Sequence, residues 1–241
     1  MAAFVLIHGS WHGAWCWYKI VPRLQYAGHR VLAIDLPGHG KDGTPPGKVT
    51  MQDYVDCIGR AIDEMQEPVV LVGHSRGGIA ITQAAEAHAE KIRRLVYLAA
   101  YLVPNGRTII PLFMSDEDSL VRSNLIVNRD EGWDMLKSTV FREALYADCP
   151  DDDVALAHAL LRPEPAAPPA ATPISTTEQR GGSIPRTYIH LRQDFAISAP
   201  LQQRMIAEVP CQQVLSMDTS HSAYFSAPDE LIGHLTTAAN S

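Results

Sequence analysis

The stretch VVLVGHSRGGIAI, residues Val69 to Ile81, decides the fold class of this chain. Four apolar residues lead into the sequence Gly-His-Ser-Arg-Gly, and small residues suited to a closely packed helix follow. The serine, Ser75, lies in a G-x-S-x-G motif between a predicted strand and a predicted helix. In that setting the serine sits on a sharp, strained turn with its hydroxyl exposed. Flanking glycines permit the close backbone approach that the turn needs. We therefore interpret Ser75 as a nucleophile rather than as part of a structural turn.

Short apolar runs on both sides of this stretch alternate with helical patterns. They predict buried strands at Phe4–His8, Arg30–Asp35, Val69–Gly73, Arg94–Ala99, Thr187–Leu191 and Gln213–Met217. Thr50 and Asp53 predict the capped start of one helix, and the run from Ser226 to Asp229 predicts the start of the last helix. This alternation is typical of an α/β fold, a parallel sheet with right-handed crossovers and helices on both faces.

The alternation breaks between about Pro104 and Pro185, where the chain becomes more polar and then rich in proline. We therefore expect a core of residues 1–103 and 186–241, with residues 104–185 inserted as a lid. The tract RPEPAAPPAATP, Arg162 to Pro173, predicts an extended return segment. A disordered linker is the alternative. Apolar residues at helical spacing favour a helical lid; they are Trp133, Leu136, Val140, Phe141, Leu145 and Leu156–Leu161.

Composition excludes several classes of protein. The net charge is −7 and no run of lysine or arginine is present, which argues against a nucleic-acid or anionic-membrane surface. No apolar run approaches the roughly 20 residues that span a bilayer. The N-terminus reads as a strand rather than a signal peptide, so we expect a cytoplasmic protein. The four cysteines lack C-x-x-C spacing, which favours free thiols over zinc ligands or disulfides.

A serine hydroxyl needs a base, and the base needs an acid that holds it. On this type of fold the chain order is serine, acid, histidine. His190 and His234 fall inside a predicted strand and the last predicted helix. His221 follows the last strand in a loop, so we expect it to be the base. His74 is expected to point away from the serine and to pack in the core.

The acid is expected at a strand end on the same edge of the sheet. Asp194 follows the preceding strand and is favoured, and Asp218, three residues before His221, is the rival. An oxyanion hole needs two backbone N–H groups. We expect them from Arg76, next to the nucleophile, and from Ser10, in the loop after the first strand.

The lining of the substrate pocket is less determined by the sequence. Its candidates are Trp11, Phe113, Met114, Trp133 and Ser222. For the lid side chains, a place in the lid core is an equal alternative. His8 and His12 are four residues apart, but no third ligand lies nearby, so we expect structural roles for them and no metal or cofactor.

With these residues assembled, the chain resembles α/β-hydrolases of the group that contains plant methylesterases, plant hydroxynitrile lyases and bacterial and pyrethroid-type carboxylesterases. The matching segments are FVLIHGSWHGAWCWYKIVPRL, AGHRVLAIDLPGHGKD, VVLVGHSRGGIAI, YIHLRQDFAI and MDTSHSAYFSAPDEL. The resemblance implies an α/β-hydrolase fold with six parallel strands and an inserted helical lid. It also implies Ser75 as nucleophile, Asp194 as acid, His221 as base, and Ser10 and Arg76 as oxyanion donors.

The chain departs from the lyases of this group at two positions. Those lyases carry a lysine after the catalytic histidine, where this chain has Ser222, and commonly a cysteine after the nucleophile, where it has Arg76. The resemblance therefore implies a serine carboxylesterase acting on small to medium-sized esters through an acyl-enzyme. The alternatives are a hydroxynitrile lyase-type C–C lyase and a non-catalytic small-molecule receptor. The lid face leaves a homodimer possible.

Overall fold

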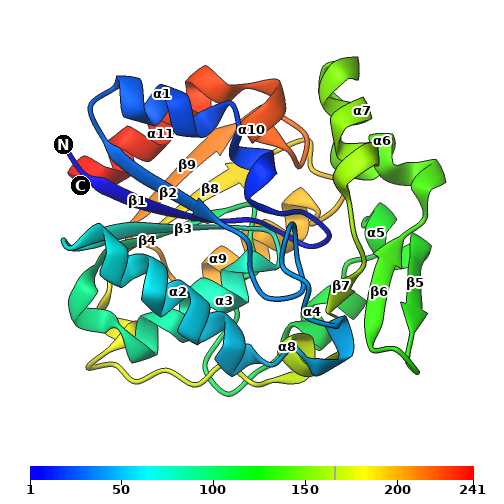
Figure 1. Ribbon diagram of the computed structural model, residues 1–241, viewed down its shortest axis with the longest axis horizontal. Coiled ribbons are helices and arrows are strands. Elements are labelled where there is room, and N and C mark those ends of the chain that lie inside the picture. The colour runs from blue at the N-terminus through cyan, green and yellow to red at the C-terminus, as the bar shows by residue number, and fades with distance from the viewer. Residues whose placement is uncertain (166) are drawn as a thin grey trace.

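The computed structural model describes residues 1–165 and 167–241. Its main sheet has the strand order β2-β1-β3-β4-β8-β9, and every neighbouring pair is parallel (Figure 1). The strands are β1 (Ala3–Ile7), β2 (Arg30–Ile34), β3 (Val69–His74), β4 (Ile92–Leu98), β8 (Arg186–Leu191) and β9 (Gln213–Met217). The predicted six-stranded parallel sheet is therefore confirmed, with each predicted strand placed to within two residues at either end.

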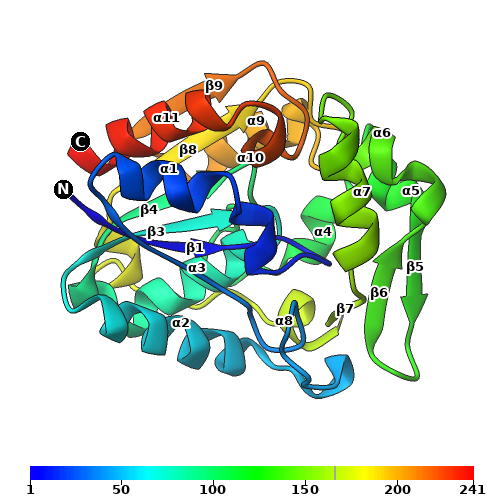
Figure 2. The same ribbon diagram turned by 45° about the horizontal axis from the view of Figure 1, so that its top comes forward.

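Helices cover both faces of this sheet, as Figures 1 and 2 show. On one face lie α1 (Ile20–Tyr26), α10 (Ala223–Ser226) and α11 (Pro228–Asn240). On the other lie α2 (Met51–Met65), α3 (Gly77–Ala87) and α9 (Ala199–Glu208). Short 3-10 helices connect some of these elements; they are η1 (Ala14–Trp17), η2 (Pro46–Lys48), η3 (Ala89–Lys91), η4 (Ser138–Val140) and η5 (Gly181–Ser183).

The alternation of side chains along β1 explains why the sheet needs two helical layers. Phe4 and Leu6 join the hydrophobic cluster that includes α1 and α11, whereas Val5 and Ile7 join the cluster that includes α2 and α3. All four side chains are fully buried. Complete burial of such a side chain stabilises the fold by about 1.5–3 kcal/mol. A strand that is apolar on both faces therefore forms only inside a layered α/β core.

The predicted helix starts are partly correct. At α2 the hydroxyl of Thr50 accepts a hydrogen bond from the backbone N–H of Asp53, and the carboxylate of Asp53 accepts one from the N–H of Thr50. This reciprocal pair confirms the predicted cap. The last helix begins at Pro228 as expected, but Ala227 and not Ser226 occupies the N-cap. Proline favours the first helical position even where no side chain caps the helix.

Residues 104–185 lie between β4 and β8 and contain both helices and strands. The helices are α4 (Ile109–Met114), α5 (Leu120–Asn124), α6 (Phe141–Leu145), α7 (Asp151–Leu160) and α8 (Ala167–Ala171). The strands β5 (Leu125–Asn128), β6 (Trp133–Leu136) and β7 (Glu164–Pro165) form a small antiparallel sheet in the order β5-β6-β7. The two ribbon views agree that this small sheet lies beyond one end of the main sheet (Figures 1 and 2).

The expectation of a purely helical lid is therefore wrong for Trp133 and Leu136, which lie on strand β6. A spacing of three residues between apolar side chains is compatible with a helix, but Gly132 permits a hairpin turn here. Its φ is +73°, and its N–H donates to the carbonyl of Asn128 at 2.9 Å. Pairing of β5 with β6 then replaces the helix.

The tract 162–173 is also only partly an extended return. Glu164–Pro165 pairs with β6 at the edge of the small sheet, a place that tolerates proline, and α8 follows. Residue 166 of this tract lies outside the described residues.

Among the helices that the structure describes, none combines the length and the apolar character that a membrane span requires. Cys16, Cys57, Cys149 and Cys211 are free thiols.

Candidate active site

Ser75 stands on the sharp turn between β3 and α3. Its φ is +54°, a left-handed conformation that costs a non-glycine residue about 1–2 kcal/mol. Hydrogen bonds hold the turn, because the Ser75 carbonyl accepts the N–H groups of Gly78 at 3.1 Å and Tyr101 at 3.0 Å. At Gly77 a Cβ atom would lie 2.6 Å from the carbonyl oxygen of His8, so only glycine fits. This strained, well-fixed turn presents the hydroxyl of Ser75 to a cavity.

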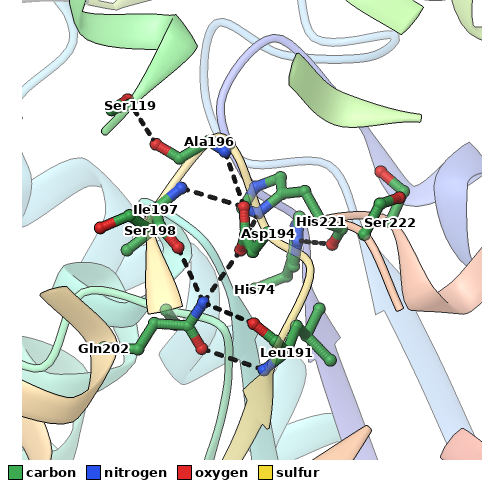
Figure 3. Close-up of polar contacts among 12 residues, drawn as sticks. His74, Ser119, Leu191, Asp194, Ala196, Ile197, Ser198, Gln202, His221 and Ser222 are labelled. Carbon is green, nitrogen blue, oxygen red and sulfur yellow. Dashed lines mark hydrogen bonds and ion pairs between the residues drawn. The ribbon is translucent and has the colours of Figure 1, made fainter. Parts of the chain in front are cut away.

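The base and the acid predicted from the sequence meet in the structure. Nδ1 of His221, in the loop after β9, lies 2.7 Å from Oδ2 of Asp194, in the loop after β8 (Figure 3). Because a carboxylate only accepts, Nδ1 carries the proton and Nε2 is left to accept one. The rival Asp218 is exposed and pairs with Arg192 at 2.7 Å. The geometry therefore joins His221 to Asp194.

Asp194 is held by donors on both carboxylate oxygens (Figure 3). Its Oδ1 accepts the backbone N–H groups of Ala196 at 2.7 Å and Ile197 at 3.0 Å. Its Oδ2 accepts Nε2 of Gln202 at 3.1 Å, in addition to His221. Gln202 is fully buried on α9 and is not among the site residues predicted from the sequence. The available signal was a polar residue on the apolar stripe of that helix.

His74, expected to point away from the serine and to pack, directly contacts His221, the predicted base. Its Nε2 donates to the backbone carbonyl of His221 at 3.0 Å, and the two ring centroids lie 4.4 Å apart (Figure 3). Burial and the adjacent His221 lower the pKa of His74 well below its usual value. A neutral His74 thus fixes the loop that carries His221 without adding a charge beside it.

The loop after β1 packs closely against Ser75. A Cβ atom on Gly9 would lie 2.7 Å from Cβ of Ser75, so glycine is required for this approach. The carbonyl of Ser10 accepts Nδ1 of His12 at 2.6 Å, and Nε2 of His12 accepts the hydroxyl of Tyr146 at 2.6 Å. Burial lowers the pKa of His12 to about 4, so its ring stays neutral.

The imidazole of His8 likewise makes hydrogen bonds to backbone groups. Its Nε2 accepts the N–H of Leu36 at 3.1 Å, and its Nδ1 donates to the carbonyl of Gly9 at 2.8 Å. Burial lowers its pKa to about 3. Both ring nitrogens of this histidine are therefore occupied.

Across the described residues, no acceptor is found for the backbone N–H of either Ser10 or Arg76.

The side chain of Arg76 takes part in a buried ion-pair network that no sequence pattern indicates. Its Nη1 lies 3.0 Å from Oδ2 of Asp134 on β6 and 3.5 Å from Oε1 of Glu164 on β7. Oε2 of Glu164 accepts the backbone N–H of Trp11 at 2.9 Å and Nε2 of His39 at 2.6 Å. No local pattern indicates these contacts, because they join positions far apart in the chain.

The charge states in this network follow from burial and pairing. Burial opposes ionisation of Glu164, but His39 and Arg76 outweigh it and lower the pKa of Glu164 to about 2. Burial likewise opposes the cation on His39, yet Glu164 raises its pKa. For Asp134, burial and the neighbouring Glu164 outweigh Arg76, and its pKa is raised.

A cavity of about 590 Å³ lies above Ser75 and His221. Its lining includes Ser10, Arg76, Tyr101 and Asp134, and its apolar side chains are Trp11, Ile109, Ile110, Phe113, Met114, Val121, Leu125, Val127, Leu145, Ala170, Ala171, Ala196 and Ile197. Trp11, Phe113 and Met114, three of the candidates named from the sequence, thus line this cavity.

Two expected lining residues are wrong, because among the described residues neither Trp133 nor Ser222 lines the cavity. Successive side chains of a strand point to opposite faces of the sheet, so the side chain of Trp133 points away from the cavity whereas that of Asp134 points toward it. Nε1 of Trp133 donates to Glu131 instead. Ser222 is fully buried, and its Oγ donates to the hydroxyl of Tyr224 at 3.0 Å.

Residues 4–234 match the model of the alpha/beta hydrolase family. The chain belongs to this family. It is 32% identical over 256 residues to methylesterase 18 of Arabidopsis thaliana. This alignment covers 99% of this chain and 97% of that relative. It is 33% identical to putative methylesterase 11, chloroplastic, of the same plant, over 95% of this chain. It spans only 61% of that relative's length.

Among solved structures, the methylesterase MES16 from Arabidopsis superposes with a TM-score of 0.86 at 28% identity, covering 100% of this chain and 99% of that one. The resemblance to plant methylesterases predicted from the sequence is thereby confirmed. These similarities support an activity of the carboxylic ester hydrolase class.

Proposed function

We propose that this protein is a serine carboxylesterase in which Ser75 is the nucleophile, His221 the base and Asp194 the acid. The observation that carries the proposal is the 2.7 Å bond between His221 and Asp194 next to a cavity that both Ser75 and His221 line. The left-handed turn at Ser75 adds support, since such strain at a serine is typical of a nucleophile in this fold.

These positions support the following reaction. Oγ of Ser75 attacks the ester carbonyl as Nε2 of His221 takes its proton, and Asp194 stabilises the imidazolium without becoming protonated. The N–H groups of Ser10 and Arg76 hold the oxyanion. Collapse of the tetrahedral intermediate breaks the C–O bond, and His221 returns the proton to the leaving alcohol. Water, deprotonated by His221, then releases the acid from the acyl-enzyme.

The cavity supports a substrate class. Its lining is mainly aliphatic and aromatic, and Arg76 is already paired with carboxylates, so a neutral ester fits better than an anionic one. A space of about 590 Å³ suits a small to medium-sized molecule. Because relatives are named methylesterases, methyl esters of compact aromatic or aliphatic acids are the first candidates. A cytoplasmic location and a homodimer stay predictions from the sequence.

A panel of p-nitrophenyl esters, methyl esters, lactones and cyanohydrins tests the proposal on the wild type and on Ser75→Ala. We expect ester turnover by the wild type that falls at least about 10⁴-fold in the variant. Release of cyanide from a cyanohydrin without ester turnover would favour the lyase. Tight binding of an ester without turnover would favour the receptor.

A further inference from the structure

We propose that Glu164, on the short strand β7, is a positioning residue that holds both halves of the oxyanion hole. The inference rests on the proposed function, in which Ser10 and Arg76 supply the two N–H groups. Glu164 touches neither the Ser75 hydroxyl nor the expected place of the substrate. It acts through the residue that follows Ser10 and through the side chain of Arg76.

The first contact fixes the loop after β1. Oε2 of Glu164 accepts the backbone N–H of Trp11, the residue directly after Ser10, at 2.9 Å. Trp11 has a φ of +64°, a conformation that an aromatic residue adopts only where its surroundings enforce it. The carbonyl of Trp11 accepts the N–H of Arg162 at 2.9 Å. The segment that carries Glu164 thus binds both backbone groups of the strained residue and so sets the direction of the preceding peptide.

The second contact reaches the other half of the hole. Oε1 of Glu164 lies 3.5 Å from Nη1 of Arg76, whose guanidinium also pairs with Asp134 at 3.0 Å. The backbone N–H of Arg76 is the second proposed donor. A single carboxylate therefore contacts both the loop of Ser10 and the residue of the second donor. The distance between two donors matters because they must converge on one oxygen atom.

The surroundings of Glu164 suit a fixed acceptor. The residue is 2% exposed, and the groups that face it are the guanidinium of Arg76, the imidazole of His39, the N–H of Trp11 and the carboxyl group of Asp134. With a pKa lowered to about 2 by His39 and Arg76 against the cost of burial, it is ionised throughout the neutral range. An ionised acceptor makes a stronger hydrogen bond to a backbone N–H than a neutral one.

Kinetics of Glu164→Gln and Glu164→Ala on p-nitrophenyl butyrate test the proposal. Gln keeps an oxygen that can accept the Trp11 N–H, so we expect kcat to fall about tenfold in Gln and about a hundredfold in Ala, with KM within about threefold of the wild type. Inhibition by a trifluoromethyl ketone, whose adduct with Ser75 places an oxyanion in the hole, should weaken in parallel with kcat. Glu208→Gln, which removes an exposed ion pair to Arg107, is the matched control and should change neither value.

A readout independent of turnover is hydrogen exchange at the peptide that contains Trp11. Its protection should drop in Glu164→Ala and partly return in Glu164→Gln. If Glu164→Ala does not fold, the near-isosteric Gln variant carries the test. A folded Gln variant with wild-type kcat and wild-type protection at Trp11 overturns the inference, as does a rise in KM alone. If the wild type turns over no ester, the proposed function is wrong. Loss of hydrogen-exchange protection at Trp11 in Glu164→Ala still tests whether Glu164 holds the Trp11 backbone.

Discussion

Replacing Asp194 with asparagine gives a sharp test of the base and acid assignment. Two backbone donors, from Ala196 at 2.7 Å and Ile197 at 3.0 Å, face Oδ1 of Asp194. The amide oxygen of an asparagine is expected at this place, because its NH₂ group would otherwise meet two backbone N–H donors that cannot turn away. At Oδ2 the two donors are side chains, and Nε2 of Gln202 keeps the carbonyls of Leu191 and Ile197 as acceptors. The NH₂ group then replaces Oδ2, which lies 2.7 Å from Nδ1 of His221.

A donor at that position forces His221 into the wrong tautomer. Nδ1 must accept, the proton moves to Nε2, and the ring can no longer take the proton of Ser75. We expect kcat on p-nitrophenyl butyrate at pH 7.5 to fall about 10⁴-fold, which corresponds to about 5 kcal/mol in the barrier. The matched control is Asp218→Asn, which changes the exposed rival acid paired with Arg192 and should leave kcat within about twofold.

Circular dichroism and thermal unfolding of both variants establish that each is folded before the rates are compared. A loss of less than tenfold in Asp194→Asn refutes the tautomer argument. A large loss in Asp218→Asn with little loss in Asp194→Asn transfers the acid role to Asp218.

Three further changes probe other parts of the structure. Gln202→Leu leaves the N–H of Leu191 and the carbonyl of Ile197 unpaired in the core, so urea denaturation should give an unfolding free energy about 2–4 kcal/mol lower; a loss under about 1 kcal/mol contradicts this. Phe113→Ala widens the cavity, so kcat/KM for an octanoate ester relative to a butyrate ester should rise about tenfold, and an unchanged ratio contradicts it. Burial lowers the folded-state pKa of His12 to about 4 from 6.5, so acid destabilises the fold as the pH falls from 6.5 toward 4. The Tm of His12→Gln should therefore fall less steeply than that of the wild type between pH 6.5 and 4.5, and equal slopes contradict it.

The core of the fold follows directly from the sequence. Runs such as Val69–Gly73 are too short for a buried helix, apolar on both faces, and bounded by turn residues. The sharp turn at Ser75 can be predicted because its glycines, the preceding strand and the following helix are contiguous in the sequence. The proximity of Asp194 and His221 can be predicted because the carboxyl ends of parallel strands meet at one edge of the sheet. The loops that carry the two residues therefore converge.

The lid and the residues that support the site follow less directly. Trp133 and Leu136 carry the same apolar spacing in a helix and in a hairpin, and only the turn at Gly132 and the pairing with β5 decide between them. Glu164 stands in a proline-rich tract with no pattern that predicts burial. Its contacts with Trp11 and Arg76 join positions that only the folded chain brings together.

The most direct test of the central claim is to find the atom that reacts. Diethyl 4-nitrophenyl phosphate transfers its phosphoryl group to a nucleophilic serine oxygen and releases 4-nitrophenolate, whose absorbance counts the reacted sites. Peptide mapping by mass spectrometry then locates the group. We predict a single diethylphosphoryl group per chain, on Ser75, with loss of ester turnover and no labelling of Ser75→Ala. A phosphoryl group on another residue, or full turnover by Ser75→Ala, would contradict the assignment of Ser75 as the nucleophile.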